Sequence, residues 1–148
     1  MSVSFKITDN SDKFLSELKD KTIETLETVG LMAEGYAKRL CPVGTPESTG
    51  IKGYIGGTLR NSITHALDGE QAAISSYTDN AGNTKGYYSG SMVRDMGNTR
   101  SVYIGTNVEY GPYVEMGTSK TKAKPFIKPA VVNHGDEYRQ VTERIMRK

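Results

Sequence analysis

The sequence predicts an α+β fold in which a long N-terminal helix and a C-terminal helix pack on a small, mostly antiparallel β-sheet. Two segments of the 148-residue chain, residues 12–40 and 125–145, repeat apolar side chains at intervals of three and four, as amphipathic helices do. Segments between them alternate apolar and polar side chains, which is the pattern of half-buried strands. We expect one domain over residues 1–148, because this length suits a single core of ordinary size.

The N-terminal part of the chain predicts a short strand followed by the long helix. Residues 2–7 alternate apolar and polar side chains, which predicts the strand. Pro42 should end the helix, because the residue before a proline is disfavoured in the α region. Gly30 and Gly35 lie inside the helical stripe, where each glycine costs about 1 kcal/mol relative to alanine. We therefore expect them to mark a bend or a close helix crossing.

The middle of the chain predicts strands joined by loops. Residues 43–57 are punctuated by glycine and proline and predict a loop. Residues 59–67 alternate and predict a strand, although their apolar spacing of four also suits a helical turn. Residues 72–77 and 101–108 predict two further strands. The stretch between them, residues 78–100, is rich in Gly, Asn and Ser and predicts the extended tip of a long hairpin.

The C-terminal segment has the most regular helical stripe of the chain. We expect its helix to begin at Pro125 or Pro129, because proline suits the first helical turn. Apolar side chains then follow at intervals of four and three up to Ile145, and Gly135 is the weak point in the middle. Basic side chains near the end of this segment complement the helix dipole.

The composition limits the class of protein. The apolar share is 36%, low for a compact monomer, so either the fold is extended or some surface is buried against other subunits. A formal net charge of +2 does not fit a nucleic-acid-binding polycation. No apolar run approaches the roughly 20 residues that span a bilayer, and no signal peptide is visible. The single cysteine, Cys41, excludes an intramolecular disulfide, so we expect a cytosolic product.

The residue types that carry chemistry do not form a recognisable motif. His65 and His134 are favoured as hydrogen-bonded packing residues, since two histidines alone do not make a typical zinc site. Cys41 is favoured as a small packing residue rather than a nucleophile. Glu115 lacks a visible acid–base partner, and an ion pair with a nearby lysine is favoured. Residues 53–57 lack the Gly-Lys-Ser/Thr ending of a phosphate loop. We expect no catalytic, metal or cofactor site.

The connector over residues 110–130 is the most distinctive segment, and it predicts contacts rather than catalysis. It should act as a hinge before the last helix, with Tyr110, Tyr113 and Val114 packing it down, Gly117 turning it and Phe126 anchoring the helix. Three alternating lysines in the connector fit either phosphate contacts or a solvated loop. Two adjacent tyrosines at the hairpin tip fit either a contact surface or packing on the sheet. The candidate subunit and partner contacts are Tyr54, Tyr87, Tyr88, Tyr110, Tyr113, Glu115, Lys120, Lys122 and Lys124.

Five short motifs in a fixed order carry a family resemblance. They are Leu-Cys-Pro-Val at residues 40–43, Gly-Thr-Leu-Arg-Asn-Ser-Ile at 57–63, Val-Tyr-Ile-Gly-Thr at 102–106, Tyr-Gly-Pro-Tyr-Val-Glu-Met-Gly-Thr at 110–118 and Pro-Phe-Ile-Lys-Pro-Ala at 125–130. The chain resembles the head–tail joining, or tail-completion, proteins of long-tailed bacteriophages, the group that includes the lambda-type minor tail protein Z.

The resemblance implies a structural virion protein, not an enzyme, with an α+β fold. Such a subunit forms a homo-oligomeric ring, taken as hexameric, at the neck or tail end of the virion after assembly in the host cytoplasm. Its implied partners are the phage tail tube protein and a head connector or stopper protein. DNA passes through the channel without sequence-specific contact, and no membrane or cofactor is involved.

The chain also departs from the family pattern. Cys41 stands where the family often has alanine, residues 51–58 are inserted, and the predicted hairpin tip is long. These departures concern the loops, so the loops need not touch the same partners. The alternative function is a small nucleic-acid-binding protein that uses the lysine-rich connector and the basic C-terminus.

Overall fold

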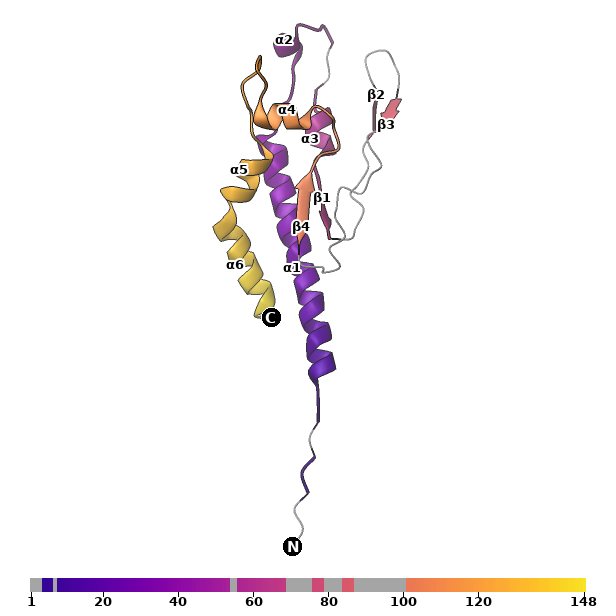
Figure 1. Cartoon of the computed structure of the whole chain (residues 1–148), viewed down its shortest axis with the longest axis vertical. Coiled ribbons are helices and arrows are strands. Elements are labelled where there is room, and N and C mark those ends of the chain that lie inside the picture. The colour runs from indigo at the N-terminus through magenta and orange to yellow at the C-terminus, as the bar shows by residue number, and fades with distance from the viewer. Residues whose placement is uncertain (1–3, 7, 54–55, 69–75, 79–83, 87–100) are drawn as a thin grey trace.

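The computed structural model describes residues 4–6, 8–53, 56–68, 76–78, 84–86 and 101–148, and it confirms the α+β class (Figure 1). The elements are α1 (Ser11–Leu40), α2 (Pro46–Thr49), α3 (Thr58–Ser62), β1 (Thr64–Leu67), β2 (Ser76–Thr78), β3 (Thr84–Gly86), β4 (Val102–Gly105), α4 (Gly111–Met116), α5 (Ile127–Val132) and α6 (Gly135–Met146).

Helix α1 is the axis of the molecule, and its 30 residues span about 45 Å. Its C-terminal part packs against α5 and α6 on one side and against β1 and β4 on the other (Figure 1). The helix ends where Pro42 predicts, because Cys41 is already extended and donates its backbone N–H to Ala37 O at 2.9 Å.

Gly30 is the point where α1 approaches the sheet most closely. A Cβ at this position would lie 2.6 Å from both His65 Cδ2 and Val102 Cγ2. The expected close crossing is therefore present, but the partner is the β1–β4 sheet and not another helix. A Cβ on Gly35 would meet nothing within 4 Å, so close packing does not account for that glycine.

The two glycines give opposite predictions for alanine substitution. Gly30→Ala should lower the free energy of unfolding by about 1–3 kcal/mol, because the added methyl overpacks the helix–sheet contact. Gly35→Ala should raise it by about 0.5–1 kcal/mol, because alanine is the better helix former and has room. Urea unfolding followed by circular dichroism measures both, and equal shifts of the two midpoints would contradict the close contact at Gly30.

The sheet next to α1 has two antiparallel strands. β1 pairs with β4 in the register Thr64 with Gly105 through Leu67 with Val102, so residues 101–108 contain a strand as predicted. β2 pairs with β3 in a second antiparallel pair. β3 falls within the predicted hairpin tip, and β2 covers the end of the predicted strand 72–77. The remainder of these two predicted segments lies outside the described residues.

Two strand predictions were wrong in whole or in part. Of the predicted strand 2–7, the described residues 4–6 form no strand and Phe5 is 87% exposed, because alternation creates two faces but does not supply a partner strand. Residues 2, 3 and 7 lie outside the described residues. The segment 59–67 is a strand only in its second half. Its first half contains the short helix α3. Leu59 lies in this helix and Ile63 directly follows it, and both side chains are buried in the core.

The predicted C-terminal helix is divided into two helices. α5 begins between the two candidate prolines and α6 begins at Gly135, the weak point of the stripe. The break lies at Asn133 and His134, and Tyr138 Oη bridges it by donating to Ala130 O at 2.6 Å. Gly135 starts the second helix, a position where the low helix propensity of glycine costs less than it would inside one continuous helix. Both helices can therefore follow the side of α1 (Figure 1).

The core lies where the C-terminal end of α1 meets α3 and α5. Its buried members are Ala37, Cys41, Leu59, Ile63, Val108, Phe126 and Ala130. Phe126 is fully buried, which confirms its predicted role as the anchor of the last helical segment. Burial raises the pKa of the Cys41 thiol to about 11, so this cysteine is a packing residue, as predicted.

Candidate interaction surface

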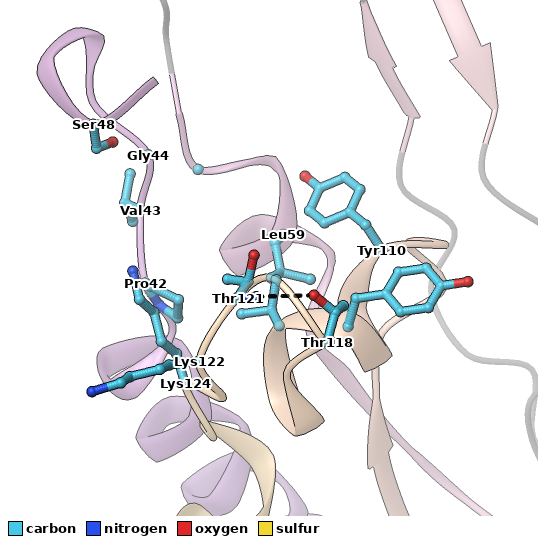
Figure 2. A pocket seen from close by; sticks show the side chains of 13 residues that line it. Pro42, Val43, Gly44, Ser48, Leu59, Tyr110, Thr118, Thr121, Lys122 and Lys124 are labelled. Atoms are coloured by element: carbon cyan, nitrogen blue, oxygen red, sulfur yellow. Dashed lines mark hydrogen bonds between the residues drawn. The ribbon is translucent and has the colours of Figure 1, made fainter. Parts of the chain in front are cut away.

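Three separate segments converge beyond the C-terminal end of α1. They are the residues that follow α1, the start of α3, and α4 with the loop that leads to α5 (Figure 1). Figure 2 shows Leu59 between Val43 on one side and Tyr110 on the other. The connector over residues 110–130 therefore forms one wall of a surface that is built from several segments.

The surface contains a groove of about 360 Å³. Its residues are Pro42, Val43, Gly44, Ser48, Gly57, Leu59, Tyr110, Tyr113, Val114, Thr118, Thr121, Lys122 and Lys124. Leu59 and the half-buried Val114 continue into the core, whereas Tyr113 is 62% exposed. This volume is within the range of about 300–1,000 Å³ that binding sites occupy.

One wall is shaped by helix capping. In α2, Ser48 N–H donates to Thr45 Oγ1 at 3.2 Å, and Thr45 N–H donates to Ser48 Oγ at 2.8 Å. This capping box stabilises the short helix within a segment that the sequence predicts only as a loop. It thereby places Ser48 beside the groove.

The opposite wall is a folded turn. Residues 111–116 form α4, with a proline in the first turn, so the first part of the predicted connector is helical. Gly117 turns the chain as predicted: its φ is +76°, and a Cβ there would lie 2.6 Å from Ala123 N. Lys124 N–H then donates to Val114 O at 2.8 Å, which closes the loop.

Glu115 has a role that the sequence interpretation missed. Its carboxylate accepts three backbone N–H groups, from Phe126 at 2.7 Å, Ile127 at 3.0 Å and Lys128 at 2.8 Å. These donors belong to the first turn of α5, which has no partners for them within the helix. The predicted lysine ion pair is replaced by an N-terminal helix cap, and the carboxylate is half-buried beneath the surface.

The pKa of Glu115 reflects this cap. Burial by itself raises the pKa of the carboxyl. The three backbone donors and the charge of Lys128 together lower the pKa by more than burial raises it, so the net shift is downward. The charged carboxylate is thus stabilised for a structural purpose. No sequence signal pointed to it, because the cap comes from eleven residues before the first donor.

The other predicted contact residues differ in their exposure and in their position relative to the groove. Tyr113 is 62% exposed, so it does not pack the connector down as predicted, whereas Val114 packs against the core. Tyr110 is 40% exposed and lines the groove. Lys122 and Lys124 border the groove, and Lys120 is exposed on the same loop. Tyr54, Tyr87 and Tyr88 lie outside the described residues.

His65 forms a second cluster of titratable groups, between β1 and α1. Its Nδ1 lies 2.5 Å from Glu34 Oε2 and its Nε2 lies 3.0 Å from Glu27 Oε2. Its backbone N–H also donates to Glu34 Oε2 at 3.2 Å. The predicted hydrogen-bonded histidine is confirmed, and it ties the sheet to the helix at the level of Gly30.

This cluster predicts a loss of stability with rising pH. Burial by itself lowers the pKa of His65. The bonds to Glu34 and Glu27 raise the pKa by more than burial lowers it, so the net shift is upward from 6.5. The protonated form is favoured in the folded state. Its contribution to the free energy of unfolding is therefore complete below pH 6.5 and is lost as pH rises through the pKa of the folded state. Urea midpoints across pH 5–9 should fall over this window, and His65→Gln should flatten the curve. An unchanged slope in that variant would contradict the linkage.

His134 is also a packing residue, as predicted. Its ring stacks on Tyr36 with centroids 3.4 Å apart and an interplanar angle of 6°. Its Nδ1 lies 3.1 Å from Glu137 Oε1, and the Tyr36 hydroxyl donates to the same carboxylate group. These contacts join α6 to α1.

The described part of the chain has no group of three or more His, Cys, Asp or Glu side chains placed to hold a metal ion. In the same residues, no helix combines the length and apolar character that crossing a membrane requires. Comparisons with protein-family models, curated proteins and solved structures returned no match for this chain.

Proposed function

We propose that this chain is a structural subunit of the neck or tail terminus of a long-tailed bacteriophage, where it forms a ring that joins the tail to the DNA-filled head. The partners are further copies of the chain, the tail tube protein and a head connector or stopper protein. DNA passes through the ring without sequence-specific contact. The proposal combines the five resemblance motifs with the surface chemistry described above.

The observation that carries the proposal is the placement of exposed apolar side chains. A single exposed leucine means little, but a contiguous apolar patch marks an interaction site. One patch lines the groove, where Val43, Tyr110 and Tyr113 are 38%, 40% and 62% exposed. A second patch lies on the first turns of α1, at Phe14, Leu15 and Leu18. Two distant patches suit a subunit that contacts two neighbours.

The two most distinctive motifs are also joined in space. Glu115 belongs to the motif at residues 110–118, and its three donors belong to the motif at 125–130. The paired motifs therefore describe one structural unit, a capped helix start beside the groove. This supports the resemblance, because a shared pattern that builds a surface is expected in proteins that share an assembly role.

Electron microscopy of particles assembled without this chain tests the function. We expect full heads and finished tails that remain separate, with joining restored when the purified chain is added. Normal virions formed in the absence of the chain would refute the proposed function.

The nucleic-acid-binding alternative is favoured by one observation, three exposed lysines on a single loop at residues 120, 122 and 124. Under the proposed function, the isolated chain should bind duplex DNA no more tightly than ordinary non-specific binding, with a Kd of about 10⁻⁴–10⁻⁶ M at physiological salt. Fluorescence anisotropy across a salt series measures this. Nanomolar binding with a steep salt slope, lost when the three lysines are replaced by glutamine, would favour the alternative.

A further inference from the structure

We infer that the first turns of α1 of one copy dock in the groove of a second copy. This inference rests on the proposed function and names the contact between neighbouring subunits. It joins two surfaces of the same chain, an exposed apolar helix face and an apolar groove with a basic border.

The helix face is the N-terminal continuation of the stripe that packs α1 in the fold. Phe14, Leu15 and Leu18 are 63%, 59% and 38% exposed, whereas Thr25 and Ala33 further along the same face are buried. Figure 1 shows that the first turns of α1 extend beyond the C-terminal end of α6. The spacing of three and four between these side chains is that of helices that dock in apolar grooves.

The groove offers an apolar surface on which side chains of such a helix can be buried. Pro42, Val43, Leu59 and Val114 form its apolar part, and its volume is about 360 Å³. Tyr113 stands at its edge as an exposed aromatic side chain, the type of residue that dominates binding energy when a partner covers it.

The two surfaces are complementary in charge. Among the residues that the structure describes, the groove lining includes Lys122 and Lys124 and no carboxylate. Residues 9–20, which flank the apolar helix face, contain four carboxylates and two lysines. One of these lysines, Lys13, already lies 3.9 Å from Glu17. The helix therefore brings a net negative charge to a positive border, which favours this pairing over a groove-to-groove contact.

The positions of the surfaces determine the kind of assembly. The apolar helix face and the groove lie near opposite ends of α1, about 40 Å apart along the helix axis at 1.5 Å per residue. A contact between unlike surfaces is heterologous, so every copy offers one of each and the chain of contacts continues. Such a contact closes into a ring when the rotation between copies permits it, as the proposed function requires.

Cross-linking between two full-length variants tests the contact. Leu18→Cys and Tyr113→Cys proteins are mixed in equal amounts and treated with a short bifunctional maleimide. We expect the mixed Leu18→Cys–Tyr113→Cys adduct to exceed both same-variant adducts at least fivefold. Native Cys41 should stay unmodified, because it is buried and its pKa is raised to about 11.

Leu31→Cys provides the matched control, since Leu31 is 63% exposed on the same helix but on the opposite face. Mixed with Tyr113→Cys, it should give at most the background yield. An equal yield from Leu31→Cys would overturn the inference, and so would a dominant Leu18→Cys–Leu18→Cys adduct, which indicates symmetric pairing of two helices. Absence of any mixed adduct at millimolar subunit concentration would overturn it as well.

A second variant tests the contact without chemical modification. Leu18→Glu should weaken self-association in sedimentation velocity at least tenfold, with an unchanged melting temperature as the check on folding. Unchanged association would contradict the docking. Failure here is separable from failure of the proposed function: a chain that still restores head–tail joining without this adduct retains the function but uses another contact.

Discussion

Replacing Glu115 with glutamine should lower the free energy of unfolding by about 1.5–3 kcal/mol, the usual range for hydrogen bonds to a charged group. The carboxylate accepts three backbone N–H groups at the start of α5, at 2.7–3.0 Å. A glutamine has one acceptor oxygen, no charge, and an NH₂ group that faces donors. At least one N–H of the helix start therefore loses its partner. Urea unfolding followed by circular dichroism gives the difference.

The same cap predicts a dependence on acid. The pKa of Glu115 is lowered from 4.5 in the folded state, so its stabilising contribution is complete above pH 4.5 and is lost as pH falls through the folded pKa. The difference between the native chain and Glu115→Gln should therefore shrink below pH 4.5. Urea midpoints at pH 7 and pH 3 measure this change.

Glu109→Gln is the matched control, because Glu109 is exposed and lies just before α4. Its unfolding midpoint should differ from that of the native chain by no more than about 0.5 kcal/mol, the usual range for surface substitutions. Equal midpoints for the Glu115 and Glu109 variants would show that the cap contributes nothing.

Replacing Phe126 with alanine should have the largest effect, a loss of about 3–5 kcal/mol. Phe126 is fully buried and packs in the cluster that joins α1, α3 and α5. Its removal takes away the apolar contacts of a whole ring and leaves a cavity that neighbouring side chains fill only in part. In a domain of ordinary stability, of about 5–15 kcal/mol, this change consumes a large share of the total.

Phe14→Ala makes the same chemical change on an exposed side chain. Phe14 is 63% exposed, so the unfolding midpoint of the dilute protein should shift by no more than about 0.5 kcal/mol. A thermal scan by circular dichroism compares the two variants. A Phe126→Ala protein as stable as Phe14→Ala would mean that the assigned core is wrong.

Predictions from local patterns succeeded where the structural feature depends only on residues that are close together in the sequence. The stripe of α1 and its end before Pro42 depend on spacing within a few turns, and both were predicted. Spacing of four was ambiguous at Leu59 and Ile63, where a short helix formed instead of a strand. Gly135 was recognised as a weak point, but only packing along α1 shows that the chain breaks there.

Predictions about the surface were less complete. The connector was correctly identified as a distinctive segment, and its lysines at 122 and 124 border the groove. The groove itself also needs Pro42, Val43 and Leu59, which are remote in sequence from the connector. No pattern within the connector indicates that these residues lie beside it.

Local sequence patterns were enough to predict the α+β class, the extent of the long helix, the turn at Gly117 and the anchoring of the last helical segment by Phe126. These features depend on periodicity, on backbone preferences and on the apolar character of single side chains, all of which are local. The folded chain was needed to show that Glu115 caps α5, that Gly30 lies against His65 and Val102, and that three segments form a groove. Each depends on contacts between residues far apart in the chain, which no local pattern specifies.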